Sequence, residues 1–471
     1  MDGPGDQGGT RYFLRRHDGD GAVPLIFARA PTARAGQTLH VTGSLERGVL
    51  AVAEYEIDDD GFGDPGRMAN KLLEPTSIRQ RSTAVVLVDI GGGINRSADF
   101  FDDYMYSTGN AGPLMGFDAD DRSVVEYYDE TSYGAYELIG AVEGPESWSG
   151  EACSDCGTNL ARTISDQLSN EYDSYIWYYG SEIPNCGYGW GSQGTWDRPE
   201  SNVWFNGDVF PTAIPHEMGH NLGLVHSSSI DCGNVPLADD PLTCSTDEYG
   251  NPLSIMGNLG VGQMMGIEKW YFGWFGGCNG VRVRTSGTFT LLPIEIPCEG
   301  IQTLQVPMPV NDRTLDTEQS EWINYARYYY LEFRQTVGLD SDIAQGVYVH
   351  VSDEISPQDE YSMRSVVLDM NPSTNRVDGM QPGESYTDPA GGVSFSVDAP
   401  DADHATITVT LDSATGSNEC MDGTLLEGSG PDDCRAWRHL ACRARVGTPA
   451  ERRPASPGLW LSRAEPPSLP P

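Results

Sequence analysis

The spacing of apolar and polar positions divides the chain into parts with different periods. Within residues 81–280, apolar runs alternate with stretches at helical spacing. The apolar run at 83–90 predicts a buried strand, and Leu160, Ile164 and Leu168 recur at the spacing of an amphipathic helix. Such alternation is typical of an α/β (α+β) domain with a mixed sheet. The same reading predicts strands at 135–142 and 175–179 and helices at 97–106, 123–130 and 261–275.

From Gly280 onward the apolar period becomes two. Val347, Val349 and Val351 share one face of an extended segment. Such half-buried antiparallel strands predict a C-terminal β-sandwich. The expected division of the chain is a small N-terminal β module at 1–80, a catalytic domain at 81–280, the β-sandwich at 281–415 and a disordered, Pro- and Arg-rich tail at 416–471.

Charge and cysteine content narrow the class of protein. The chain carries 69 acidic and 29 basic residues, a net charge of −40, which disfavours binding to nucleic acid. No apolar run reaches the roughly 18 residues that a membrane span needs. Ten cysteines fit an oxidising compartment, so we expect a secreted, extracellular protein, although the polar N-terminus shows no clear signal peptide. Cys232 and Cys244 bracket an acidic loop and form the first disulfide that we expect.

The segment that carries chemistry occupies residues 216–226 and reads His-Glu-Met-Gly-His-Asn-Leu-Gly-Leu-Val-His. On a helix, His216 and His220 lie four residues apart and share a face. Gly223 can adopt a positive φ, and such a turn would bring His226 back as a third ligand. Three histidines suit Zn²⁺ with a fourth position open to water, the arrangement of a catalytic site. A core histidine satisfied by packing would account for one of the three only.

Glu217 directly follows the first of these histidines. It can lie beside the metal without binding it, so it is the candidate general base that takes a proton from zinc-activated water. The residues themselves predict hydrolysis by zinc-activated water; hydrolysis of peptide bonds, with a protein or peptide as substrate, is what the family resemblance described next implies. Acidic loops elsewhere in the chain also make Ca²⁺ a candidate structural ion, without assigning its ligands.

The HExxHxxGxxH pattern resembles the signature of the metzincin zinc endopeptidases. That resemblance implies a Met-turn, a methionine beneath the zinc ligands. Met256 lies 30 residues after His226 and is the natural candidate, while its rivals Met264 and Met265 lie in the predicted following helix. Astacin-like and serralysin-like enzymes carry a zinc-binding Tyr two residues after that methionine. Asn258 stands there in this sequence, so no Tyr ligand is carried over.

More narrowly, residues 81–280 resemble the gametolysin-like metalloproteases. The resemblance implies secretion, dependence on zinc and cleavage of extracellular or cell-wall proteins. It rests on three further motifs, Ser132–Gly134, Cys186–Trp190 and Gly250–Gly257.

Two other functions compete with a zinc endopeptidase. One is a zinc-binding adhesion or wall protein with an inactive protease fold, although inactive relatives usually lose the general base and Glu217 is present. The other makes the β domain a carbohydrate-binding module, for which Trp322 and Tyr328–Tyr330 are aromatic candidates; sandwich core is the simpler explanation of these side chains.

Two segments near the predicted catalytic domain have open roles. Residues 1–80 are a candidate inhibitory pro-domain, but the first cysteine is Cys153, so a cysteine switch within that region is excluded. Gly187–Gly194 is either an edge strand above the site, where an extended substrate would add as a further strand, or a surface loop.

Overall fold

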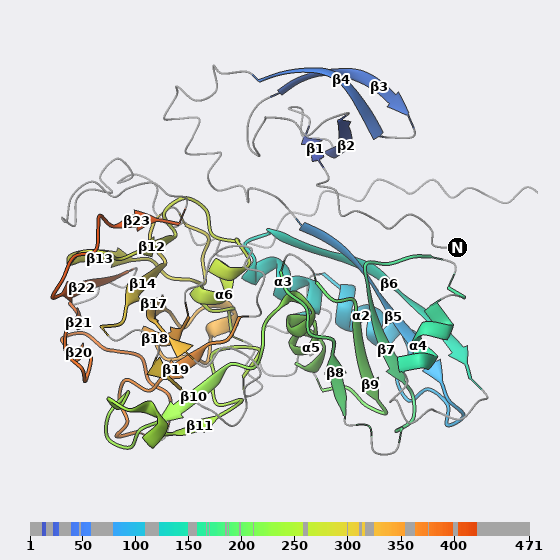
Figure 1. Ribbon diagram of the computed structural model, residues 1–471. Coiled ribbons are helices and arrows are strands. Elements are labelled where there is room, and N and C mark those ends of the chain that lie inside the picture. The colour runs from blue at the N-terminus through green and yellow to red at the C-terminus, as the bar shows by residue number, and fades with distance from the viewer. Residues whose placement is uncertain are drawn as a thin grey trace, which may run out of the picture.

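The computed structural model describes four strands within residues 12–57 and most of residues 79–421 (Figure 1). The predictions for Asn258, for Trp322 and for the tail beyond residue 421 lie outside the described residues. Within 79–421 the description omits 109–121, 149–157, 166, 169, 184–185, 187, 197–198, 211, 258–261, 299, 310–312, 316–324, 354–362, 375 and 399–403.

A four-stranded sheet lies at the N-terminus, in the order β1-β2-β4-β3. The predicted β-rich character of this part of the chain therefore agrees with the structure. Its strands are β1 (Tyr12–Arg15), β2 (Ala22–Phe27), β3 (Leu39–Glu46) and β4 (Val49–Ile57).

A mixed five-stranded sheet in the order β6-β5-β7-β9-β8 follows. Strands β5, β6, β7 and β9 run parallel to one another, whereas β8 pairs antiparallel with β9 and forms an edge. The mixed sheet expected from the sequence is therefore present. The strands are β5 (Arg79–Asp89), β6 (Tyr136–Ser147), β7 (Ser174–Tyr179), β8 (Gly189–Gly191) and β9 (Asn202–Asn206).

Helices cover both faces of this sheet (Figure 1). Val85 and Leu87 of β5 belong to the core formed with α2, α3 and α5, whereas Val86 and Val88 pack against α4. Burial on both faces explains why β5 reads as one continuous apolar run. The helices are α2 (Ala98–Tyr106), α3 (Val124–Thr131), α4 (Thr158–Ser165), α5 (Ala213–Leu222) and α6 (Gly266–Tyr271).

Helix α6 is shorter than the helix predicted at 261–275. Met265 is its N-cap, and its backbone N–H donates to Glu268 at 2.8 Å, which fixes the start of the helix. All residues of α6 are buried. A segment that is apolar on every side carries no periodicity that would mark its ends.

Two sheets form the predicted β-sandwich. Leu304, Leu331 and Val349 of an eight-stranded sheet share one core with Phe395 and Ile407 of a four-stranded sheet. The larger sheet has the order β11-β10-β19-β18-β17-β14-β12-β23 and the smaller one β13-β22-β21-β20. The larger sheet comprises β10 (Ser228–Asp231), β11 (Ser245–Asp247), β12 (Gly280–Arg282), β14 (Thr303–Pro307), β17 (Tyr328–Arg334), β18 (Gly346–Ser352), β19 (Val366–Leu368) and β23 (Glu419–Cys420). The smaller sheet comprises β13 (Gly287–Leu291), β20 (Ser385–Thr387), β21 (Val393–Val397) and β22 (Ala405–Leu411).

The eight-stranded sheet includes strands from outside the range 281–415. Strands β10 and β11 come from the range assigned to the catalytic domain, and β10 pairs in parallel with β19. Strand β23 comes from the range assigned to the tail and pairs with β12. The catalytic range and the sandwich are therefore joined by backbone hydrogen bonds.

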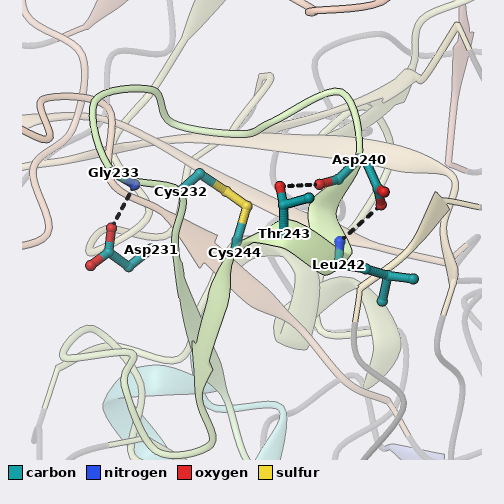
Figure 2. Close-up of a disulfide and its surroundings, with 7 residues drawn as sticks. All are labelled: Asp231, Cys232, Gly233, Asp240, Leu242, Thr243 and Cys244. Atoms are coloured by element: carbon teal, nitrogen blue, oxygen red, sulfur yellow. Dashed lines mark hydrogen bonds between the residues drawn. A yellow bond between two sulfur atoms is a disulfide. The ribbon is translucent and has the colours of Figure 1, made fainter.

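The disulfides Cys232–Cys244 and Cys278–Cys420 close loops around this sheet. Cys232 and Cys244 are bonded as expected and close the acidic loop between β10 and β11 (Figure 2). Asp240 of that loop accepts hydrogen bonds from the backbone N–H of Leu242 and the hydroxyl of Thr243. Cys278–Cys420 ties β23 to the start of β12 across 142 residues of sequence. Among the helices of the described residues, none has the length and apolar character needed to cross a membrane.

Candidate metal centre

Helix α5 carries the first two histidines of the motif. Thr212 occupies its N-cap position without a side-chain capping hydrogen bond. Gly223 ends the helix in the left-handed region with φ 107°, and its N–H donates to the carbonyls of Gly219 and His220. The expected turn is thus present, and it directs the chain back toward the helix.

The structure brings the three histidines together. The ring centroids of His216, His220 and His226 lie 4.9 to 5.4 Å apart. One ring nitrogen of each lies within 4.8 Å of the others, and the Nε2 atoms of His220 and His226 are 3.2 Å apart. Among the described residues this is the group of His, Cys, Asp and Glu side chains whose geometry can hold a metal ion.

Each histidine is oriented by a hydrogen bond from its other ring nitrogen. The Nδ1 atoms of His216 and His220 lie 2.8 Å from the carbonyls of Ile255 and Leu224. The Nδ1 atom of His226 lies 2.6 Å from Oε1 of Glu248. Carbonyl and carboxylate oxygens only accept, so each Nδ1 carries the proton of its hydrogen bond, which leaves the Nε2 atoms as the candidate ligands. Neutral imidazoles held in this way are the form that binds zinc.

Burial sets the charge of the histidines on α5. It lowers the pKa of His216 to about 4 and that of His220 to about 3. Desolvation is the main cause in both, because the protonated ring would lose its hydration. Both rings are therefore neutral at pH 7 even before a cation competes with the proton.

Glu217 follows His216 on α5, and it meets the edge strand of the five-stranded sheet. Burial raises the pKa of its carboxyl to about 7, and a hydrogen bond from the backbone N–H of Gly191 acts in the opposite direction. Gly191 belongs to β8 and approaches so closely that a Cβ there would lie 2.5 Å from the Glu217 carbonyl oxygen. A side chain at position 191 would therefore push the edge strand away from the carboxylate.

Met256 packs directly under the helix that bears the histidines. It is fully buried, and a Cβ at Gly219 would lie 2.3 Å from its sulfur. Its neighbour Ile255 accepts the hydrogen bond from His216. The rival Met265 instead accepts a hydrogen bond through sulfur from the Asn251 amide, at 3.1 Å. Of these two methionines, Met256 is therefore the one that packs against the helix bearing the histidines.

Two residues near the histidines, Glu248 and Tyr249, could not be predicted from the sequence. Glu248 orients His226, and the ring of Tyr249 lies 4.0 Å from the ring of His226, with 43% of its side chain exposed. Their backbone follows β11, whose place in the large sheet brings the turn over the histidines. Glu248 is one of 69 acidic residues and Tyr249 one of 22 tyrosines, so no local pattern marks either of them.

The chain was compared with protein families, with curated proteins and with solved structures, and only solved structures gave matches, at low similarity. No protein-family model matches the sequence, and no curated protein matches it. Among solved structures, archaemetzincin from Methanopyrus kandleri is similar, at 16% identity over 31% of this chain and 76% of its own, with a TM-score of 0.19. A structure described as a chaperone-substrate complex is similar at 15% identity over 42% of this chain and 30% of its own, with a TM-score of 0.20. At these scores neither likeness carries an argument about this chain.

Proposed function

We propose that this protein is a secreted, zinc-dependent endopeptidase of the metzincin type, most similar to the gametolysin-like metalloproteases. It hydrolyses peptide bonds in extracellular or cell-wall proteins. The observation that carries the proposal is the convergence of His216, His220 and His226, on a helix and turn that also carry Glu217, whose carboxyl is largely buried. Histidine is a preferred zinc ligand, and three protein ligands are the usual set of a catalytic zinc site.

The three histidines fit zinc because each Nδ1 atom is already hydrogen-bonded to an oxygen. The remaining ring nitrogens are then the atoms that can bind one ion together. Zinc bound there supplies Lewis-acid chemistry, polarising a peptide carbonyl and lowering the pKa of water to about 7. Glu217 takes the proton from the attacking water and then delivers it to the departing amine. The Gly191 N–H orients the carboxylate for both transfers.

The edge strand β8 supports a mode of substrate binding. It has one strand neighbour, β9, in the described sheet, and it lies against Glu217 through Gly191. An extended peptide that pairs with the other edge of β8 would pass next to the general base. Of the two interpretations of Gly187–Gly194, the strand is therefore the one on which we base substrate binding.

Secretion is supported by the covalent cross-links. Cys232–Cys244 and Cys278–Cys420 are disulfides of the kind that persist in an oxidising compartment. The inhibitory role of residues 1–80, the boundaries at 81, 281 and 416, and a bound Ca²⁺ stay predictions.

Casein hydrolysis by the purified full chain tests the proposed function. We expect activity that a zinc chelator removes and added zinc restores. Glu217→Ala should keep about one zinc per chain and lose roughly 10²–10⁴-fold in turnover, because general acid–base catalysis supplies about that factor. Elemental analysis of the metal is the control for both proteins. Full activity in Glu217→Ala would refute the role of this residue, and a zinc-bound wild type without activity would favour the inactive adhesion protein.

A further inference from the structure

The loop that carries the third histidine runs beside the C-terminal sheet. The N–H of Met363 donates to the carbonyl of Gly223 at 2.8 Å, and the N–H of Val225 donates to the carbonyl of Met363 at 3.0 Å. The N–H of Ser228 then donates to the carbonyl of Ser365 at 3.1 Å, where β10 begins to pair with β19. The turn is therefore hydrogen-bonded to the β-sandwich on both sides of His226.

Ser227 connects this pairing to the Met-turn. Its N–H donates to the carbonyl of Met256 at 2.9 Å, and its hydroxyl lies 2.8 Å from the hydroxyl of Ser365. The side-chain amide of Asn251 donates to the same Ser227 hydroxyl at 2.8 Å. Both serines are buried, so a hydroxyl that lost its protein partner would have no water to replace it, and the loss would destabilise this contact. The residue directly after His226 is thus held by the sandwich and by the Met-turn together.

A second contact reaches the Met-turn from the sandwich. Arg334 of β17 is fully buried and donates from Nη1 to the carbonyl of Leu253 at 3.3 Å and from Nη2 to the carbonyl of Gln263 at 3.1 Å. Its charge is balanced by Glu332 at 2.7 Å and Asp340 at 3.1 Å. The guanidinium therefore binds backbone on both sides of Met256, and removal of this buried cation would leave two buried carboxylates without it.

We propose that the β-sandwich is a structural part of the metal centre and that Ser365 is a positioning residue for His226. The inference rests on the proposed zinc site. His216 and His220 are fixed by α5, whereas His226 lies on a turn without regular structure of its own. Ordering a flexible backbone costs conformational entropy, so a turn without these hydrogen bonds would lose that entropy when zinc binds and would bind the ion more weakly. Hydrogen bonds to the sandwich order the turn before zinc binds and so pre-organise His226 as a ligand.

Zinc affinity of the full chain, measured by competition with a chromophoric chelator, tests this inference without reference to proteolysis. Ser365→Ala removes the hydroxyl pair and should weaken zinc binding about five-fold, the equivalent of one ordinary hydrogen bond. The matched control is Thr408→Ala, which removes the hydroxyl pair with Thr288, 3.1 Å apart in the smaller sheet. It should leave the dissociation constant unchanged. Equal affinity in Ser365→Ala and wild type would overturn the positioning role.

Hydrogen exchange of the wild-type protein gives a second test that needs no variant. Zinc should slow exchange in Gly346–Ser352, the central strand β18 of the sandwich, as well as in α5, because a ligand stabilises the whole cooperative unit that forms its site. Slower exchange confined to α5 and its turn would overturn the proposal. Wild type that binds no zinc would overturn the proposed function as well, whereas casein hydrolysis with unchanged affinity in Ser365→Ala would overturn the positioning role alone.

Discussion

Glu248 offers the sharpest test of how the third histidine is held. Of the three groups that accept from the Nδ1 atoms, it is the one side chain, whereas the other two are backbone carbonyls. Substitution can therefore remove this bond and leave the others in place. The hydroxyl of Ser228 donates to the backbone carbonyl of Glu248 at 3.0 Å, a bond that does not depend on the carboxylate.

The expected size of the effect follows from distance and exposure. Oε1 of Glu248 lies 2.6 Å from Nδ1 of His226, and the two side chains are 40% and 23% exposed. Loss of such a partner typically costs 10- to 100-fold in metal affinity. Because water can reach this pair and partly replace the carboxylate, we expect Glu248→Ala to lie at the lower end, about ten-fold or about 1.4 kcal/mol. Glu248→Gln keeps an acceptor and should lose less.

The assay is a chelator competition at fixed pH with the zinc-free full chain. Glu182→Ala, the same change at an exposed glutamate, is the control for altered charge and should bind zinc like wild type. Affinities ordered wild type, Gln, Ala would support the orientation of His226 by this carboxylate. Identical dissociation constants for wild type and Glu248→Ala would show that the ring is held without it and would refute the reasoning.

Three further predictions concern the helix and its turn. Gly219→Ala would place a Cβ 2.3 Å from the Met256 sulfur, so urea denaturation should show a loss of about 1–3 kcal/mol; an unchanged midpoint would contradict this packing. Gly223→Ala forces a side chain into φ 107°, and its extra cost of about 1–2 kcal/mol should appear as weaker zinc binding and a lower melting temperature. In the zinc-free protein, burial holds the pKa of His216 near 4 and that of His220 near 3. Unfolded imidazoles titrate near 6.5, so their contribution to stability is intact above that pH and should fall as pH drops toward 4. Because the raised pKa of Glu217 acts with the opposite sign in this range, the comparison is with a His216→Asn, His220→Asn variant; a wild-type urea midpoint that falls no more than that of the variant between pH 7 and pH 5 would contradict the last prediction.

The candidate metal centre was predictable because its information is local. His216 and His220 are related by one turn of helix, and Gly223 supplies the conformation that the return of His226 requires. The sandwich strands were predictable for a similar reason, since burial on one face imposes a period of two. Both signals fit inside a window of about a dozen residues.

The connection between the two parts of the molecule was not predictable. Strand β10 is a short segment after the motif, and its partner β19 lies far along the sequence. Nothing in either segment specifies the other, because strand pairing depends on tertiary placement rather than on local pattern. The same holds for Arg334, whose hydrogen bond to the carbonyl of Leu253, near Met256, forms only when the sheet is assembled. The open question about Gly187–Gly194 also needed the neighbouring strand β9.

The parallel pairing of β10 with β19 has a consequence for the timing of assembly during translation. The ribosome releases the chain from its N-terminus, and Val366 follows its partner Ser228 by 138 residues. Pairings of such long range form late, after the intervening polypeptide has been made. A nascent chain would therefore contain all three histidines before the strand that holds the turn of His226 had been synthesised. For the proposed zinc site, the hydrogen bonds that hold the third ligand would therefore be completed only after synthesis has passed Leu368.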